Sequence, residues 1–463
     1  METVKRVKRD FTSGKILKNL ILFSIPMALA TLLQVLFNSA DIAIVGQFGG
    51  SIYQASVGAT SSTVHLIVNL FIGISVGANV AMANAYGAKD ENRQEKVVHS
   101  AMAISLASGF FVLVAGVFLA KPILTTIDTP SDIIEYSTIY MQIYFLGAPA
   151  MMIYNFGSAL MRAVGETKKP LYYLLVAGLL NVGINAITVI FFHWHVIGVA
   201  LGTTISQYVS AFWIVLDLRR EKYGIFYKIR KTKFHKTQTV KILTLGIPMG
   251  LTSCFFSLSN LLVQSSVNAY GQTAIAGNTV ASNVDTICDA FASAIEKSVV
   301  TIVGQNMGAQ KPERVHRVLG AGLFSCFVVQ GFYALLCLFF GKYICMLYNS
   351  DPAVIEWALR RMSINSVFQW ILCFAYAYGA TLRGMGYSLF PMFINLLFTC
   401  VVRVVYLSFI YPYFPTCTIE MVYIIYPITW VCYGCMLMVA FYIIAHKKGY
   451  LRKHRIKTET TVE

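Results

Sequence analysis

Long apolar runs separated by short polar segments dominate the chain. Each run is long enough to cross a hydrocarbon core of about 30 Å as an α-helix. A transmembrane β-barrel would instead show alternating segments of about ten residues. The pattern predicts twelve membrane-spanning helices, over Leu17–Val45, Ala55–Tyr86, Val97–Ala120, Ile134–Met161, Leu171–Phe192, Val196–Leu216, Ile242–Asn268, Ala274–Gln305, Val318–Phe340, Val354–Leu382, Leu389–Tyr411 and Met421–His446. Prolines within these runs often mark bends beside a cavity; they are Pro26, Pro149, Pro248 and Pro427.

Composition supports the same interpretation. Of the 463 residues, 57% are hydrophobic and 13% are charged, against about 45–50% and about 25% in soluble domains. A soluble protein has too little interior to bury so much apolar surface. The composition therefore excludes a cytosolic enzyme, a secreted disulfide-linked protein and a disordered chain. It predicts an all-α polytopic membrane protein.

Lysine and arginine residues gather in alternate loops. Of the 37 such residues, 31 fall in the termini and in the loops on one side of the predicted membrane. The other side has four, which are Lys121, Lys342, Arg360 and Arg361. This asymmetry follows the positive-inside rule and predicts that both termini are cytoplasmic. Basic residues spread in this way contact anionic lipid, so the net charge of +16 does not indicate nucleic-acid binding.

The second half of the chain repeats the first. Three blocks recur at an offset of 221 or 222 residues: Phe23–Met27 as Leu245–Met249, Ala85–Ala88 as Asn306–Ala309, and Ala159–Gly165 as Ala380–Gly386. Each half holds six helices, an even number, so both halves enter the membrane in the same orientation, as in transporters with parallel repeats and a central cleft. The sequence predicts four regions: a six-helix bundle over 1–216, a basic cytoplasmic linker over 217–241, a second bundle over 242–446 and a basic cytoplasmic tail over 447–463.

Several short motifs are spread over nearly the whole chain. They are Gln34-x₃-Asn38-x₂-Asp41-x₄-Gly46, Tyr86-Gly-Ala88, Arg162-x₂-Gly165, Asn181 and Val303–Ala309. Together with the helix number and the duplication, these motifs resemble the MATE (multidrug and toxic compound extrusion) transporters. The resemblance implies efflux of amphipathic, often cationic organic compounds, driven by inward movement of H⁺ or Na⁺.

A carboxylate within a membrane helix is costly, which makes Asp41 a candidate for function. At 100° per residue, Gln34, Asn38 and Asp41 lie on one helix face within about 60°. We expect Asn38 and Asp41 in a cation-coupling site and Gln34 in a substrate cavity. The resemblance implies that further coupling residues are Asn181, Asn185 and Thr203. Many family members have Asp at the position of Asn185, so this chain is expected to have a singly charged site. The alternative is a buried hydrogen-bonded network with a structural role.

A second set of polar residues lies in the predicted helix Ala274–Gln305. The set falls within about 40° on one stripe and consists of Asn278, Asp285, Asp289 and Glu296. Three ionised acids facing lipid would cost roughly 8–10 kcal/mol, so the stripe is expected to line a cavity or the interior between helices. These residues are candidates for attracting organic cations or relaying protons. The alternative is that the acids pair with Lys297 and Arg403.

His65 and Asn69 are spaced i, i+4 in the second predicted helix, and the repeat places His65 near the position of Asp285. A membrane histidine can titrate near neutral pH, so both residues are candidates for lining the substrate cavity. The alternative is a helix–helix hydrogen bond.

Motifs of other chemistries are missing from the sequence. It has no Walker A, His-Glu-x-x-His or Gly-x-Ser-x-Gly motif, so we expect no ATPase or other enzyme and no catalytic residue. All ten cysteines follow residue 253, and Cys432-x₂-Cys435 has no second pair. We therefore expect no metal site and no cofactor besides the coupling ion. Whether Cys345 and Cys417 form a disulfide stays open.

The sequence thus predicts a secondary active antiporter that exports amphipathic or cationic organic compounds in exchange for H⁺ or Na⁺. We expect a monomer in a bacterial cytoplasmic membrane, with small organic molecules and the lipid bilayer as its partners. The main alternative is a flippase for lipid-linked saccharides, which would often have a cationic central cavity, whereas the charges identified here are mainly acidic. A membrane enzyme lacks its motif, and a channel fits the duplicated cleft less well.

Overall fold

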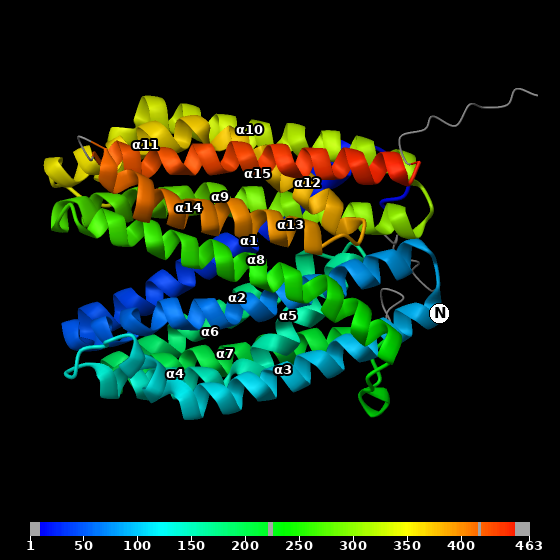
Figure 1. Cartoon of the computed structure of the whole chain (residues 1–463). Coiled ribbons are helices and arrows are strands. Elements are labelled where there is room, and N and C mark those ends of the chain that lie inside the picture. Colours follow the sequence, from blue (N-terminus) through cyan, green and yellow to red (C-terminus); the bar gives the residue numbers. More distant parts are fainter. Residues whose placement is uncertain (1–9, 221–225, 415–417, 450–463) are drawn as a thin grey trace, which may run out of the picture.

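The computed structural model describes residues 10–220, 226–414 and 418–449, and all twelve predicted stretches lie in helices (Figure 1). The helices of the first half are α1 (Ile16–Ile44), α2 (Ser51–Gly87), α3 (Glu91–Thr126), α4 (Ile134–Leu146), α5 (Ala148–Ala163), α6 (Lys168–Ala186) and α7 (His195–Leu218). Those of the second half are α8 (Lys236–Asn268), α9 (Gln272–Gly308), α10 (Pro312–Met346), α11 (Pro352–Phe368), α12 (Leu372–Gly384), α13 (Leu389–Asn395), α14 (Val402–Val405) and α15 (Ile419–Lys447). Together they confirm the predicted all-α polytopic fold.

Most of these helices are long and apolar enough to cross a membrane. Within the described ranges nine meet this condition, or ten when the bent pair α4–α5 counts as one span. The two remaining predicted spans are α9 and the pair α11–α12. Both carry charged side chains along their length, such as Asp285 in α9 and Arg361 in α11. In addition, a 3₁₀ turn divides the second pair into helices of 17 and 13 residues.

Several helices extend beyond the predicted apolar runs. Hydropathy identifies only the apolar part of a span, whereas the helix continues into polar turns. Asp90 caps the start of α3, where its Oδ1 accepts a hydrogen bond of 2.9 Å from the backbone N–H of Arg93. At the other end of the first half, α7 reaches Leu218 and α8 begins at Lys236. The segment between the two halves is therefore 219–235, shorter than the predicted linker.

Bends and π-helical turns interrupt the regular helices near polar residues. A bend of 47° separates α4 from α5 at Gly147, two residues before Pro149. The π-helical segments η1 (Val45–Gly49) and η2 (Ile187–Phe191) follow α1 and α6. Such segments are frequent at functional sites, and here they begin within four residues of Asp41 and Asn185.

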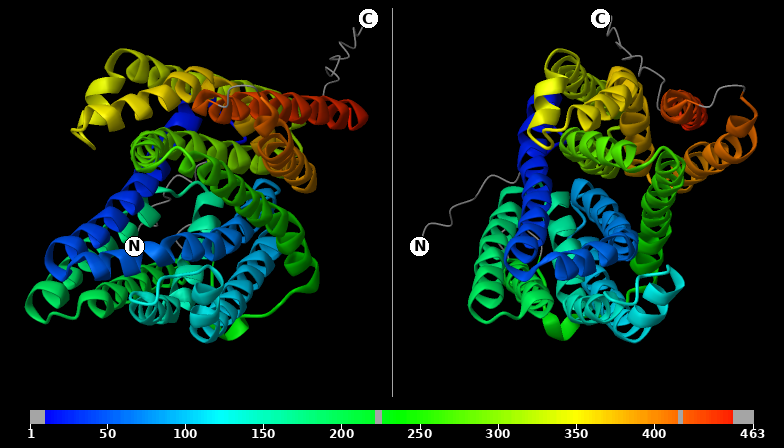
Figure 2. Two further views of the ribbon diagram at one scale, coloured as in Figure 1. Left: turned by 60° about the vertical axis from the view of Figure 1, so that its left-hand side comes forward. Right: turned by 90° about the vertical axis from the view of Figure 1, so that its left-hand side faces the viewer.

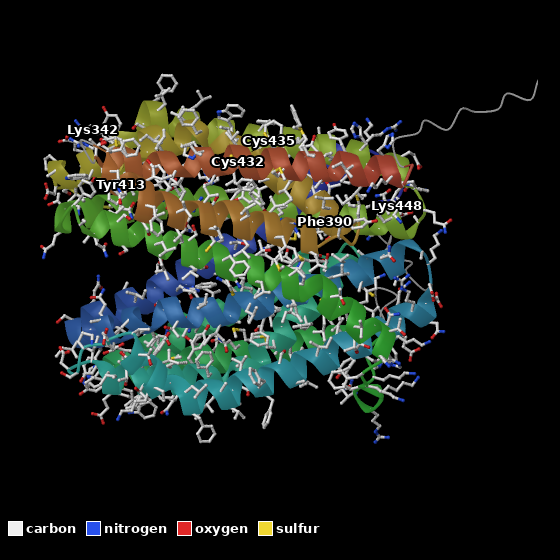
Figure 3. The ribbon with its side chains drawn as sticks, in the orientation of Figure 1. Lys342, Phe390, Tyr413, Cys432, Cys435 and Lys448 are labelled. Carbon is white, nitrogen blue, oxygen red and sulfur yellow. The ribbon has the colours of Figure 1, made fainter. Side chains whose placement is uncertain are left out.

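The helices form two lobes that are joined by two bridging helices (Figure 2). We call α2–α7 the N-lobe and α9–α15 the C-lobe. Helix α1 contacts α6 of the N-lobe and α9 and α10 of the C-lobe, whereas α8 packs along α2 and also contacts α13. Lys342 and Lys448 lie at opposite ends of the C-lobe, as their assignment to opposite sides of the membrane requires (Figure 3).

The two lobes meet through reciprocal contacts between α2 and α9. The Cα of Gly87 lies against the backbone of Gln305, and that of Gly308 lies against the backbone of Asn84, so closely that neither glycine leaves room for a Cβ atom. At the offset of 221 residues, Gly87 corresponds to Gly308 and Asn84 to Gln305. The two contacts are therefore copies of one contact, as a two-fold axis requires. They confirm the parallel repeat and join the lobes at the end that carries the basic loops.

Candidate ion-coupling and substrate site

Asp41 lies in the last turn of α1 and is only 7% exposed. The Asn185 amide on α6 donates a hydrogen bond of 2.6 Å to Asp41 Oδ1. When the Asn181 amide is oriented so that its nitrogen faces the carboxylate, it donates to the same oxygen at 2.8 Å. No described basic residue forms an ion pair with Asp41. Two neutral amides therefore hold this carboxylate in place of a counter-charge.

The second carboxylate oxygen of Asp41 has weaker partners. Thr203 Oγ1 lies 3.4 Å from Asp41 Oδ2 but only 3.0 Å from the carbonyl oxygen of Val199. A hydroxyl has one hydrogen to donate, and the shorter contact with Val199 competes for it. Asp41 Oδ2 is therefore the oxygen with unused capacity to hold a proton or a cation.

The oxygen atoms around Asp41 suit a hard monovalent cation as well as a proton. Asn185 Oδ1 is buried and has no hydrogen-bond donor in the described part of the chain, and the Thr203 hydroxyl is close by. Carboxylate, amide and hydroxyl oxygens are ligands for hard cations. The described residues contain no cluster of three or more His, Cys, Asp or Glu side chains that would hold a metal ion by itself.

Asp41 lines a cavity of about 340 Å³ between α1 and the helices of the N-lobe. Seven of the predicted site residues share this cavity: Gln34, Asn38, Asp41, His65, Asn69, Asn181 and Thr203. Asn185 lies beside the carboxylate but does not line the cavity. His65 and Asn69 form no hydrogen bond in the described structure between α2 and another helix, so the structural alternative for this pair has no support.

Several cavity residues were not identified from the sequence. They come from α4, α5 and α7 and include Tyr140, Tyr144, Tyr154, Asn155 and Gln207. The i, i+4 spacing of Tyr140 and Tyr144 could have indicated that both side chains lie on one face of α4. It was missed because tyrosine is also common in apolar helices near the membrane surface.

The polar stripe on α9 lies in the C-lobe, away from the cavity of Asp41. Arg361 Nη2 donates to Asp285 Oδ2 at 2.9 Å, and Tyr333 Oη donates to Asp285 Oδ1 at 2.5 Å. Arg361 also donates to Asn278 Oδ1 at 2.7 Å and to Ser282. Asp285 and Asn278 are thus joined through one buried arginine.

The two remaining acids of the stripe have separate partners. Asp289 Oδ1 accepts long hydrogen bonds from Gln369 Nε2 at 3.4 Å and from Tyr376 Oη at 3.3 Å. Glu296 forms an ion pair with Arg383 of α12. The four residues therefore belong to three networks rather than to one cavity.

The partners correct two interpretations of the sequence. In the alternative interpretation these acids pair with Lys297 and Arg403, whereas the ion pairs of Asp285 and Glu296 are formed with Arg361 and Arg383. Both arginines had been counted with the loops because they lie near the polar ends of predicted helices, and yet both are buried. The charges inside the C-lobe are therefore not mainly acidic, because Lys297, Arg361, Arg383 and Arg403 accompany the three acids.

Arg403 is fully buried and has no acidic partner in the described structure. Its guanidinium donates to Ser259 Oγ at 3.0 Å and to Thr429 Oγ1 at 3.1 Å, and it lies 4.5 Å from the ring centre of Tyr426. The hydroxyl groups and the aromatic face stabilise this cation.

Cys345 is a free thiol next to Met362, and Cys417 lies outside the described residues. Cys432 and Cys435 lie midway along α15 as free thiols (Figure 3).

Comparison with known proteins agrees with this architecture. The MatE family model matches residues 26–187 and 248–408, one match in each half. The chain is 27% identical to the "Probable multidrug resistance protein YoeA" of Bacillus subtilis, covering 86% of this chain and 88% of the relative. It is 23% identical to the "Multidrug export protein MepA" of Staphylococcus aureus, covering 75% and 77% of the two chains.

Solved structures share the fold. A "multidrug resistance MATE family transporter of the MOP superfamily" in an outward-facing conformation aligns with a TM-score of 0.88 at 19% identity, over 96% of this chain and 98% of that one. A structure of "MATE in the bent conformation" aligns with the same score, identity and coverage. Given these matches and the two-lobed helical fold, the chain belongs to the MatE family and is a multi-pass membrane transporter rather than an enzyme.

Proposed function

We propose that the chain exports amphipathic organic compounds across a bacterial cytoplasmic membrane in exchange for H⁺ or Na⁺ bound at Asp41. The observation that carries this proposal is a buried carboxylate in the cavity wall that has amide donors and no described basic partner. The names of the relatives, which are multidrug resistance and export proteins, support organic cargo.

The coupling step follows from the cost of burying charge. An ionised carboxylate without a counter-charge is unfavourable in a site of low polarity. A proton on Asp41 Oδ2 removes that charge, and a sodium ion beside it balances the charge. Either ion changes the hydrogen-bonding requirements of Asn181 and Asn185, which hold α6 against α1. Binding of the ion therefore favours a different packing of these two helices.

Cargo and ion use the same cavity. Its wall combines amide side chains with the tyrosines of α4 and α5 and with Phe37. Aromatic faces attract organic cations, and an ionised Asp41 adds a negative charge. Because a proton or sodium ion at Asp41 cancels this charge, ion entry weakens cargo binding and promotes release. This competition is the basis of antiport.

One coupling ion per cycle is sufficient. A single charge moving through 100 mV yields about 2.3 kcal/mol. At about 1.4 kcal/mol per tenfold change, that energy supports roughly a fifty-fold gradient of neutral cargo. The amide at Asn185, where many relatives have a carboxylate, is therefore compatible with an active pump. We expect the protein to act as a monomer with both termini cytoplasmic, in line with its basic loops.

A dye-retention assay in a host without its own pumps tests the proposal. Cells that express the protein should retain less of a cationic dye than empty-vector cells, and an uncoupler or removal of sodium should abolish the difference. Asp132→Asn, the same change at an exposed position, should leave export intact. Retention equal to that of empty-vector cells for a whole panel of dyes would contradict the proposal.

A further inference from the structure

Besides Arg403, two basic side chains near the contacts that join the lobes form no ion pair among the described residues. Asp285 and Glu296 are paired with Arg361 and Arg383. Arg162 on α5 and Lys297 on α9, by contrast, have no hydrogen bond or ion pair from their side chains in the described structure. Both are half-buried. A cation removed from bulk water without a partner is unfavourable, so both positions call for an anion.

The internal repeat shows why Arg162 lacks a partner. Arg162 corresponds to Arg383, whose carboxylate partner is Glu296. The position that corresponds to Glu296 in the first half is Ser75, at the same offset of 221 residues. The Ser75 hydroxyl donates to the carbonyl oxygen of Ile72 at 2.6 Å. The N-lobe therefore has the arginine of the ion pair but no acid at the position of its partner.

Lys297 lies on α9, close in sequence to a contact between α9 and the N-lobe. It lies one helical turn before Thr301, whose hydroxyl donates to Asn79 Oδ1 of α2 at 3.0 Å. It lies next to Glu296 in sequence, but that carboxylate is bound to Arg383. Lys297 interacts electrostatically with two groups, the like charge of Arg162 from the other lobe and the opposite charge of Glu296.

Arg162 lies beside a contact between the lobes. The carbonyl oxygens of Ala159 and Ala163, on either side of it in α5, accept hydrogen bonds from Asn79 Nδ2 at 2.9 Å and from Gln305 Nε2 at 2.7 Å. The bond from Gln305 joins the two lobes at their basic end, and the bond from Asn79 holds α2 against α5 within the N-lobe. Tyr154, two turns earlier on α5, lines the cavity of Asp41 and interacts with Arg162. The two cations thus lie between that cavity and the closed end.

We infer that Arg162 and Lys297 form an anion-binding site that holds the acidic group of an amphipathic cargo. The inference rests on the proposed export function and extends its substrates to organic acids and zwitterions. Guanidinium binds a carboxylate, sulfonate or phosphate group in a two-pronged geometry, and ammonium adds a point charge. An anion between the two side chains also removes the repulsion between the lobes. Bound cargo of this class therefore stabilises the contact between the lobes at their basic end.

A matched pair of dyes tests the site with the purified full-length protein in nanodiscs of phosphatidylcholine. Rhodamine 110 has a free carboxylate, and rhodamine 123 is its methyl ester with the same ring system. Fluorescence anisotropy measures the affinity for each dye. In the double variant R162Q/K297Q the affinity for the acid should fall about tenfold or more, whereas the affinity for the ester should change less than twofold. Lys297→Arg keeps the charge and should keep the affinity for the acid.

The control variant R360Q/K342Q removes the same number of charges from exposed positions and should bind both dyes as the wild type does. Addition of phosphatidylglycerol identifies the source of the anion: competition with the acid points to a lipid phosphate, and no competition points to soluble cargo. Unchanged affinity of R162Q/K297Q for the acid overturns the inference. If the wild type binds and exports the ester but does not bind the acid, the site is wrong and the export function stands. If the wild type binds neither dye and exports neither dye in proteoliposomes, the anion-binding site and the proposed export function are both wrong.

Discussion

At the scale of single residues, the acids of this protein differ in how their charge is balanced. Asp285 and Glu296 are each paired with an arginine, whereas Asp41 has only amide and hydroxyl neighbours. The sequence identified Asp41 because helical periodicity places Gln34, Asn38 and Asp41 on one face. It did not reveal the ion pairs, because a pair between helices depends on packing that no local pattern records.

Loss of Arg361 is expected to destabilise the C-lobe. Arg361→Gln leaves the half-buried Asp285 carboxylate without its counter-charge, and breaking such a pair costs about 3–5 kcal/mol. The thermal midpoint of the purified protein should fall clearly. In the double variant Arg361→Gln/Asp285→Asn most of the loss should be recovered, because no unpaired charge remains.

The neighbouring arginine provides the control. Arg360 is 43% exposed and pairs with Glu356 on the surface of α11, a contact worth about 0.3–0.5 kcal/mol. Arg360→Gln should therefore leave the thermal midpoint nearly unchanged. Equal shifts for the Arg360 and Arg361 variants would show that the buried ion pair has no special role in stability.

At the scale of helices, hydropathy predicted the position of every span, and the repeat predicted their orientation. The ends of the helices were less predictable, because polar end turns such as the one capped by Asp90 continue α3 beyond its apolar run. Which helices bridge the two lobes was also not predictable. Helices α1 and α8 contact both lobes, and such bridging depends on tertiary packing rather than on periodicity.

Glycines in α2 provide a test of the closed end. Gly87 leaves no room for a Cβ atom against the backbone of Gln305. Gly87→Ala should therefore destabilise the closed arrangement, at the typical cost of about 1–3 kcal/mol for added volume in a packed site. The labelling rate of a cysteine introduced by Thr301→Cys, measured from the cytoplasmic side, should rise about tenfold or more.

Gly58 lies in the same helix and has open space around the position of a Cβ atom. Gly58→Ala should leave the labelling rate of the introduced cysteine unchanged. If Gly87→Ala raises the labelling rate no more than Gly58→Ala does, the close approach of α2 and α9 does not hold the lobes together at their basic end.

At the scale of the whole molecule, two copies of one bundle meet around a pseudo-two-fold axis. The contacts between Asn79 and Thr301, and between Gln305 and Ala163, join the lobes near the basic end. The cavity of Asp41 lies between α1 and the N-lobe. Transport by alternating access requires that the contacts at the basic end separate in each cycle while the cavity and its ion site persist.

A disulfide across this interface should stop the cycle. Asn79 and Thr301 are hydrogen-bonded at 3.0 Å between α2 and α9, so Asn79→Cys/Thr301→Cys in a background without the natural cysteines should cross-link upon oxidation. Dye export should cease and return when dithiothreitol is added. Each single cysteine variant is the control. Full export by the cross-linked protein would show that the lobes do not separate there.

The central claim is that Asp41 couples an ion to cargo movement. Its most direct test is dye transport in proteoliposomes under an imposed proton or sodium gradient, with wild type, Asp41→Asn and the exposed control Asp132→Asn. We predict that one of the two gradients drives transport by the wild type and by Asp132→Asn, and that neither gradient drives it in Asp41→Asn, although that variant still binds the dye. Gradient-driven transport at the wild-type rate by Asp41→Asn would contradict the account.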